Sequence, residues 1–403
     1  MATPTDDHQE NHMQILRQMP KVELHAHLNG SIRETTLFDL ARERNIQLSS
    51  HHFSNDLLPG VDHSMYNVRP RSLQDCFAMF AEISTVVDDL PSIRRVAQEM
   101  LEDFAAEGCV YLEIRSTPKA LLLLNGSSKL ATKRDYCETV LQVMKEFQKL
   151  EQDRYNIDLS NGLKEFPRLP LVCRLIISVD RSNDVMNGWE NIQLAIELKK
   201  EYPDMVVGVD LGGNPLKREF SDFRACFEAA RQGGLFVTLH CAEVPCSDEE
   251  KESSAYQDAN AILDFVPDRL GHALLLPPIL QKKLEDLRIP VEACPTSNVM
   301  TLELAERNSG GSLLEGLSRH PQLKRWLFET NHPLAISTDD PGVFHTTATK
   351  ELVLLQKAYS LTNADLQKIV EQSMDYAFAN QETKYFIKQR IKDRFQMINE
   401  KRV

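Results

Sequence analysis

The sequence is short of positive charge, long apolar runs and paired-cysteine motifs. It contains 46 Lys and Arg residues against 59 Asp and Glu, a formal net charge of -13. This balance gives no overall positive field for nucleic acid or for an anionic membrane surface. No run of about 18 apolar residues occurs, so we expect no membrane-spanning helix and no membrane partner.

The eight cysteines follow no C-x-x-C spacing, and no apolar leader segment begins the chain. Both observations predict reduced thiols in a cytoplasmic (cytosolic) protein. Residues 1–18 are polar and are predicted to be a disordered tail. No linker divides the remainder, so residues 19–403 are expected to form one domain.

The segment 21–31, KVELHAHLNGS, alternates apolar and polar residues with the period of a strand. The alternation places His25 and His27 on one face, two positions apart, where their imidazoles can converge on a divalent ion. A pair of polar residues on the solvated face of an edge strand would give the same pattern. Gly30 and Ser31 end the strand, so both histidines lie near its carboxyl end.

Seven further apolar strands follow, separated by helical patterns. The expected strands are 21–28, 110–118, 171–180, 206–213, 235–243, 268–273, 289–298 and 333–342. Eight such strands alternating with helices predict the α/β class and a (β/α)8 TIM barrel, with extra helices after the first strand and at the C-terminus. An open doubly wound sheet is the alternative, but the LNGS turn after the first strand is not a glycine-rich phosphate turn.

Polar residues follow each expected strand, and closing a barrel would bring them to one rim. They are His25 and His27; Arg115, Ser116 and Thr117; Asp180; Asp210, Gly212 and Gly213; His240 and Glu243; His272; Ser297 and Asn298; and Asp339 and Asp340. Any single member is also typical of a cap or turn, whereas the complete ring is typical of an active site.

Within this ring, His240 provides a third imidazole and Asp339 a hard oxygen ligand. Three histidines and one carboxylate leave an open position for water, as catalytic zinc sites require. We therefore expect His25, His27, His240 and Asp339 to bind one Zn²⁺ per chain. Asp340 should point elsewhere, to orient the hydroxide or to bond a substrate nitrogen.

Two further rim residues have expected catalytic roles. Glu243, three residues after His240, is interpreted as a proton shuttle, although a loop carboxylate or a helix-capping contact would use the same residue type. His272 can hydrogen-bond the hydroxide or stabilise developing negative charge. Gly212 and Gly213 allow backbone to approach a flat ligand, although a simple turn would also use glycine.

The motifs HAHLNGS, DLGGN, HCAE, GHA, PTSN and STDDPG, in this order, resemble those of the adenosine deaminase family. The resemblance covers about 320 residues and implies a zinc barrel that hydrolytically deaminates C6 of an adenine ring. It also implies that His25, His27, His240 and Asp339 bind zinc. Glu243 would donate a proton to N1, His272 and Asp340 would position hydroxide, and the Gly213 backbone would bond N3.

Three departures indicate a particular branch of the family. Asn29 stands where adenosine deaminases have Asp, and the strands read YLEIRSTPK and SVDRS. These features resemble the adenosine deaminase-like branch, which implies that N6-methyl-AMP and water are converted to IMP and methylamine. Neutral Asn29 would not repel a 5′-phosphate. Ala273 replaces the glycine of GHG, and would narrow the space for the leaving group.

The expected partner is therefore a small purine nucleotide, with no nucleic acid bound and the chain a monomer. The substrate-binding residues are expected to be His27, Asn29, Arg115, Ser116, Thr117, Pro118, Asp180, Gly213, Glu243 and Asp340, with Lys119 beside them. Arg115 or Lys119 would supply charge for the phosphate. The loop 121–132 is a possible lid.

Other classes of protein remain open at this point. Adenosine deamination and another metal-dependent amidohydrolase activity are the enzyme alternatives. A cytidine-type zinc deaminase would need H-x-E and P-C-x-x-C motifs, which are absent. A barrel retained only for binding would be expected to lack a ligand or the shuttle, and none is missing.

Overall fold

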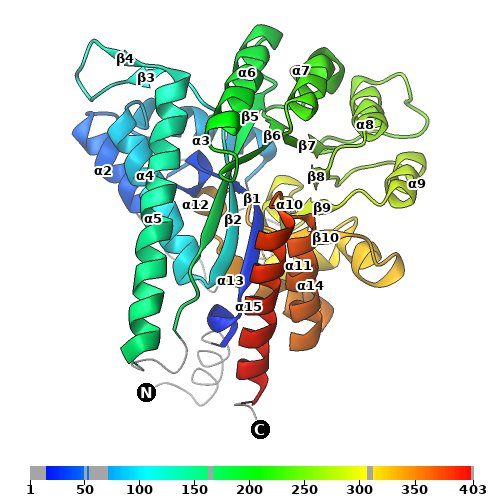
Figure 1. Ribbon diagram of the computed structural model, residues 1–403. Helices are drawn as coiled ribbons and strands as arrows, with labels where there is room; N and C mark the ends of the chain where they lie inside the picture. Colours follow the sequence, from blue (N-terminus) through cyan, green and yellow to red (C-terminus); the bar gives the residue numbers. More distant parts are fainter. Residues whose placement is uncertain (1–14, 50–51, 54–70, 162–166, 306–311, 401–403) are drawn as a thin grey trace.

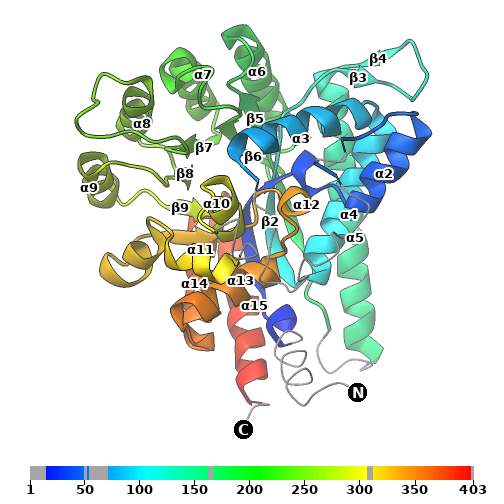
Figure 2. The same ribbon diagram turned by 180° about the vertical axis from the view of Figure 1, so that it is seen from behind.

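The computed structural model describes residues 15–49, 52–53, 71–161, 167–305 and 312–400. Eight parallel strands follow one another in a nearly closed ring, and helices surround them (Figures 1 and 2). The predicted (β/α)8 barrel is confirmed. Its strands are β1 (Lys21–His27), β2 (Cys109–Ser116), β5 (Val172–Asp180), β6 (Val206–Gly212), β7 (Phe236–Cys241), β8 (Arg269–His272), β9 (Val291–Ala293) and β10 (Leu334–Ile336).

The ring closes through residues just beyond β10. Ala26 and Asp339 form a parallel bridge, in which the His27 amide donates to the Asp339 carbonyl at 2.9 Å. The Asp339 amide in turn donates to the His25 carbonyl at 2.8 Å. Barrel closure therefore places Asp339 between the two histidines of β1.

The helices follow the predicted order, including extra helices after β1 and at the C-terminus. They are α2 (Glu34–Glu43), α3 (Leu73–Val86), α4 (Leu90–Ala106), α5 (Lys133–Asn161), α6 (Val185–Glu201), α7 (Phe220–Gln232), α8 (Ser254–Phe265), α9 (Pro278–Leu287), α10 (Pro295–Thr301), α11 (Leu313–Ser318), α12 (Pro341–Phe344), α13 (Ala348–Tyr359), α14 (Asn363–Tyr376) and α15 (Gln381–Glu400). Several begin at side-chain caps, such as the Ser72–Asp75 capping box of α3.

One local prediction differs from the structure, and two other segments have local features of their own. Residues 295–298, expected to end a strand, begin α10, because Pro295 fits the first turn of a helix. In the segment before β10, α11 ends at Ser318, before Pro321, and a π-helix follows at Arg325–Glu329. The loop 121–132 contains an antiparallel pair, β3 (Leu121–Leu122) and β4 (Leu130–Ala131).

The predicted disordered tail is too long at its C-terminal end. Residues 15–18 are helical and Leu16 is fully buried, whereas residues 1–14 lie outside the described part of the chain. The Lys21 ammonium explains this order, because it donates to the carbonyls of Leu16 at 2.7 Å and Met19 at 2.9 Å. The larger of two hydrophobic clusters in the described residues includes side chains from Leu16 to Ile398.

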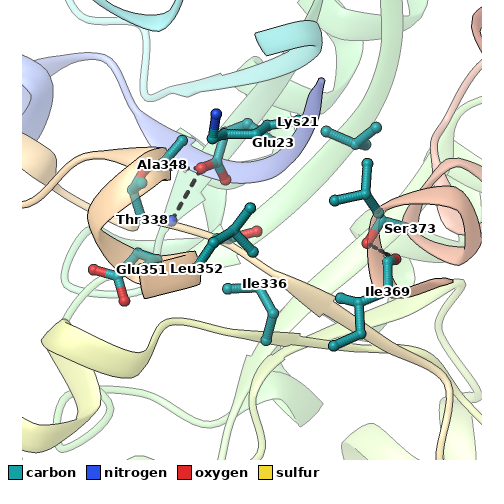
Figure 3. A pocket seen from close by; sticks show the side chains of 12 residues that line it. Lys21, Glu23, Ile336, Thr338, Ala348, Glu351, Leu352, Ile369 and Ser373 are labelled. Atoms are coloured by element: carbon teal, nitrogen blue, oxygen red, sulfur yellow. Dashed lines mark hydrogen bonds between the residues drawn. The ribbon is translucent and has the colours of Figure 1, made fainter. Parts of the chain in front are cut away.

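Glu23 links β1 to the strand that closes the barrel. The pairing of β1 with β2 is irregular between Glu23 and Ala26, and the Glu23 carboxylate lies in a small pocket that residues of α13 and α14 also line, where it is directed at Thr338 (Figure 3). It accepts hydrogen bonds from the His25 amide at 2.9 Å and from the amide and hydroxyl of Thr338 at 3.0 Å. The backbone on both sides of the His25–Asp339 contact is thus held by one side chain.

Within the described residues, none of the helices combines the length and the apolar character needed to cross a membrane.

Candidate active site

A cavity of about 580 Å³ opens at the carboxyl ends of the barrel strands. With the exception of His25, every site residue expected from the sequence lines it. These residues are His27, Asn29, Arg115, Ser116, Thr117, Pro118, Asp180, Gly213, His240, Glu243, His272, Asp339 and Asp340. His25 is fully buried beneath them. The barrel therefore brings the expected residues to one place.

The four expected metal ligands form one cluster. Their ligand atoms, from His25, His27, His240 and Asp339, all lie within 4.8 Å of one another. Nε2 of His25 is 3.2 Å from Nε2 of His27 and 3.4 Å from Oδ1 of Asp339, which is 3.5 Å from Nε2 of His27. Three imidazoles and one carboxylate in this arrangement can hold a divalent ion.

The hydrogen bonds that the Nδ1 atoms of His25 and His240 make show whether their Nε2 atoms can bind a cation. Nδ1 of His25 lies 2.9 Å from the Glu292 carboxylate, and Nδ1 of His240 lies 3.0 Å from both Asp210 Oδ1 and the Leu211 carbonyl. Because these partners are acceptors, each Nδ1 carries a proton and each Nε2 can present a lone pair to the cluster. Lone pairs and a carboxylate converging on one point fit a metal ion.

The charge distribution supports the same assignment. Although burial opposes the shift, the hydrogen bond with His25 and the neighbouring imidazoles hold the pKa of Asp339 well below its usual value. Burial and His25 lower the pKa of His27 to about 3, which leaves a neutral imidazole. Burial would lower the pKa of His240, but Asp210 raises it to about 9, so metal binding would release a proton there.

Glu292 was missed by sequence reasoning, although it organises the floor of the site. It is fully buried on β9 and contacts His25, Arg115, Thr238 and Arg269. The sequence does contain one sign of this role, because Glu292 is a carboxylate in the short apolar strand VEA and its side chain points to the opposite face from those of its two neighbours. Asp210 was recognised as a strand-end residue, but its bond to His240 was not predicted.

Arg115 is placed differently from the prediction that it meets a phosphate. Its guanidinium is fully buried and contacts Asp210, at 3.2 Å, as well as Glu292, and it donates to the Leu24 carbonyl at 3.0 Å. The side chain of a β2 residue with this register enters the barrel interior, where two carboxylates attract it. The Arg115 guanidinium therefore links the two carboxylates that hydrogen-bond to His25 and His240 of the four-residue cluster.

Lys119 is the remaining cation of that segment. It lines the cavity and is half-buried, and within the described residues its ammonium has no hydrogen bond or ion pair with another residue. Burial lowers its pKa. Ser116, which also lines the cavity, exchanges a hydrogen bond of 2.7 Å with Tyr136 of α5. The wall at 116–119 thus offers hydroxyls and one cation.

Asp340 and Glu243 have carboxyl groups that line the cavity but do not belong to the cluster of four expected metal ligands. Asp340 packs against Gly30, where an added Cβ would lie 1.6 Å from its Oδ1, and this oxygen has no hydrogen-bond partner in the described part of the chain. Burial and the Asp339 charge raise the pKa of Asp340 well above its usual value. Burial also raises the pKa of Glu243, which favours the protonated carboxyl group that can donate a proton.

Three remaining positions have clear places in the structure. Gly213 has φ +84°, and a Cβ there would lie 1.9 Å from Asp180 Oδ1, so this close approach requires glycine. Asp180 accepts from the Ser182 amide at 2.8 Å. Ala273 is fully buried and does not line the cavity, whereas Leu274 does. The expectation from the sequence that Ala273 narrows the space for a leaving group is therefore wrong.

A (β/α)8 barrel with a metal-ligand cluster and titratable groups at the carboxyl ends of its strands is typical of metal-dependent hydrolases. The family model for adenosine deaminase matches residues 20–394. The chain belongs to the adenosine deaminase family and is a hydrolytic deaminase.

Curated relatives and solved structures narrow the comparison. An N6-mAMP deaminase of Arabidopsis thaliana is 34% identical over 379 residues, covering 92% of this chain and 96% of that protein. Crystal structures of Arabidopsis ADAL with GMP and with IMP have TM-scores of 0.73 and 0.71 and identities of 32% and 31%. The match to the GMP complex covers 94% of this chain and 98% of that chain, and the match to the IMP complex covers 96% of this chain and 99% of that chain.

Proposed function

We propose that this protein is a zinc-dependent deaminase that converts N6-methyl-AMP and water to IMP and methylamine. The observation that carries the proposal is a single cavity that joins the four-ligand cluster to a wall with Asn29, hydroxyls and Lys119. The similarity to the N6-mAMP deaminase of Arabidopsis thaliana and to the structure of Arabidopsis ADAL with IMP supports the same substrate class. The substrate is the small-molecule partner, and a cytosolic monomer remains our expectation.

His25, His27, His240 and Asp339 would hold the zinc ion. When bound, zinc activates water for attack on the ring carbon that bears the substituted amine. Three histidines and one aspartate provide the nitrogen and oxygen ligands that suit zinc, and the negative charge of Asp339 would offset part of the positive charge of the ion. Glu292 and Asp210 keep two of the imidazoles in the required tautomer.

The chain's own groups bind the purine and move protons. Glu243, whose raised pKa favours proton exchange near neutral pH, donates to N1 as the ring carbon becomes tetrahedral. The Gly213 amide bonds N3, and Asp340, with its unpartnered Oδ1, bonds a further ring nitrogen. The attacking water supplies the two remaining protons: one restores the carboxyl group of Glu243, and the other passes to the amine nitrogen, so that the bond between C6 and this nitrogen breaks and methylamine leaves.

The phosphate would lie against the wall formed by Ser116–Lys119. Lys119 supplies the charge, since the Arg115 guanidinium is engaged by Asp210 and Glu292. Hydroxyls of Ser116 and Thr117 and nearby amides would complete the contacts. His27, Pro118 and Asp180 shape the cavity around the nucleotide.

Asn29→Asp is expected to weaken use of the nucleotide more than use of the nucleoside. A carboxylate near a phosphate in a partly desolvated pocket costs about 2 kcal/mol, or roughly a thirtyfold change in kcat/KM. The measurement is kcat/KM of both proteins with N6-methyl-AMP and N6-methyladenosine. Asn29→Ala is the matched control, because it removes the amide without adding charge. Equal losses on both substrates for Asn29→Asp would mean that Asn29 is not near the phosphate.

A further inference from the structure

We infer that His320, acting through Asn298, is a positioning residue that holds the proton of His272 on Nε2, the nitrogen that faces the metal cluster. This rests on the proposed function, because it assigns the way in which His272 serves the reaction. His320 lies outside the cavity and belongs to none of the motifs that identify the site. Its connection to the cavity is a chain of hydrogen bonds with a fixed direction.

The chain begins at two backbone amides. His320 precedes Pro321, which ends the helical pattern there, and its Nδ1 accepts from the amides of Gln322 at 3.2 Å and Leu323 at 3.1 Å. A backbone N–H can only donate, so Nδ1 of His320 carries no proton. In a neutral imidazole the proton is then on Nε2, and Nε2 lies 3.3 Å from Oδ1 of Asn298.

A third backbone amide fixes the orientation of the Asn298 side chain. The Cys294 amide donates to Asn298 Oδ1 at 3.3 Å, so the atom that receives both this bond and that from His320 is the oxygen. Reversing the amide would set its NH₂ against two donors in a buried place, at a cost of about 1–3 kcal/mol per unsatisfied group. Nδ2 of Asn298 therefore faces His272.

The last bond determines the tautomer of His272. Nδ2 of Asn298 lies 3.1 Å from Nδ1 of His272, and because Nδ2 can only donate, Nδ1 must accept. The proton of His272 is then on Nε2, which lies 3.9 Å from Asp339 Oδ2. His272 consequently presents a hydrogen-bond donor to the attacking oxygen and has no lone pair there with which to act as a base.

Burial preserves the donor and acceptor order of this hydrogen-bond chain. His320, Asn298 and His272 are 6%, 1% and 3% exposed, so water does not compete for these bonds. Outer hydrogen-bond partners of this type are commonly worth about 10- to 100-fold in activity. We expect the contribution of His320 to lie at the lower end, since it acts through Asn298.

The direct test is nitrogen-15 NMR of the zinc-loaded protein with labelled histidine, which distinguishes protonated from unprotonated ring nitrogens. We expect His272 to carry its proton on Nε2 in the unchanged chain. In Asn298→Asp, an oxygen would face Nδ1, and we expect His272 to gain a proton on Nδ1. A proton on Nδ1 of His272 in the unchanged chain would overturn the inference. Because this readout needs no substrate, it stands apart from any failure of the proposed activity.

The kinetic test compares two replacements of His320. His320→Phe removes both ring nitrogens and is expected to lower kcat by about tenfold, with KM nearly unchanged. His320→Gln retains a donor toward Asn298 and is expected to restore most of kcat. His332→Gln is the matched control, because His332 is also buried but donates to the Ile289 carbonyl at 2.9 Å, away from the cavity. Equal kcat in His320→Phe and the unchanged chain would contradict the inference. If His320→Phe does not fold, the NMR measurement on His320→Gln decides: loss of the proton on Nε2 of His272 in that variant would contradict the inference.

Discussion

Replacing Glu243 with glutamine is expected to lower kcat on N6-methyl-AMP by about 10³-fold, because the amide cannot transfer a proton to the ring. The change preserves the size of the side chain. Glu243 is not one of the four clustered ligands, so zinc content should stay near one ion per chain. The measurement pairs steady-state kinetics with metal analysis of the same preparation.

His240→Ala is the contrasting variant. It removes a ligand and also leaves the Asp210 carboxylate without its imidazole partner, so both zinc and turnover should be lost. Loss of zinc from Glu243→Gln as well would mean that the assignment of Glu243 as a proton donor outside the metal cluster is wrong.

Arg115→Met is expected to destabilise the folded protein by about 3–5 kcal/mol, because it leaves two buried carboxylates without their shared cation. Asp210 and Glu292 are both fully buried, and each also holds a histidine of the metal cluster. The measurement is the free energy of unfolding from urea denaturation of the metal-free protein, with zinc affinity measured in parallel.

Lys119→Met provides the comparison for Arg115. Lys119 has no ion pair in the described part of the chain, so its replacement should barely change stability but should reduce kcat/KM for the nucleotide. A stable Arg115→Met variant that loses only nucleotide selectivity would restore the sequence-based prediction that Arg115 meets the phosphate.

The fold and the grouping of the four candidate metal ligands could be predicted from the sequence because both depend on local patterns. Apolar strands alternating with helices specify the barrel, and barrel topology brings every strand end to one rim. His25, His27, His240 and Asp339 could therefore be grouped without knowledge of their distances. Their convergence within 4.8 Å agrees with that reasoning.

The residues that support the ligands could not be found in this way. Arg115 stands at a strand end, and sequence position alone does not say whether a long side chain extends to the cavity or to the barrel interior. Glu292 lies in a three-residue strand and resembles any strand residue until the fold sets it beside His25. His320 is connected to the site through Asn298, which lies 22 residues earlier in the chain, and no sequence motif joins the two.

The most direct test of the proposed activity is a substrate panel with the zinc-loaded protein: N6-methyl-AMP, AMP, N6-methyladenosine and adenosine, followed by ultraviolet absorbance. We expect the highest kcat/KM for N6-methyl-AMP, with IMP and methylamine as products and activity lost on chelation of the metal. A higher kcat/KM for adenosine than for N6-methyl-AMP, or full activity in metal-free protein, would contradict the proposed activity.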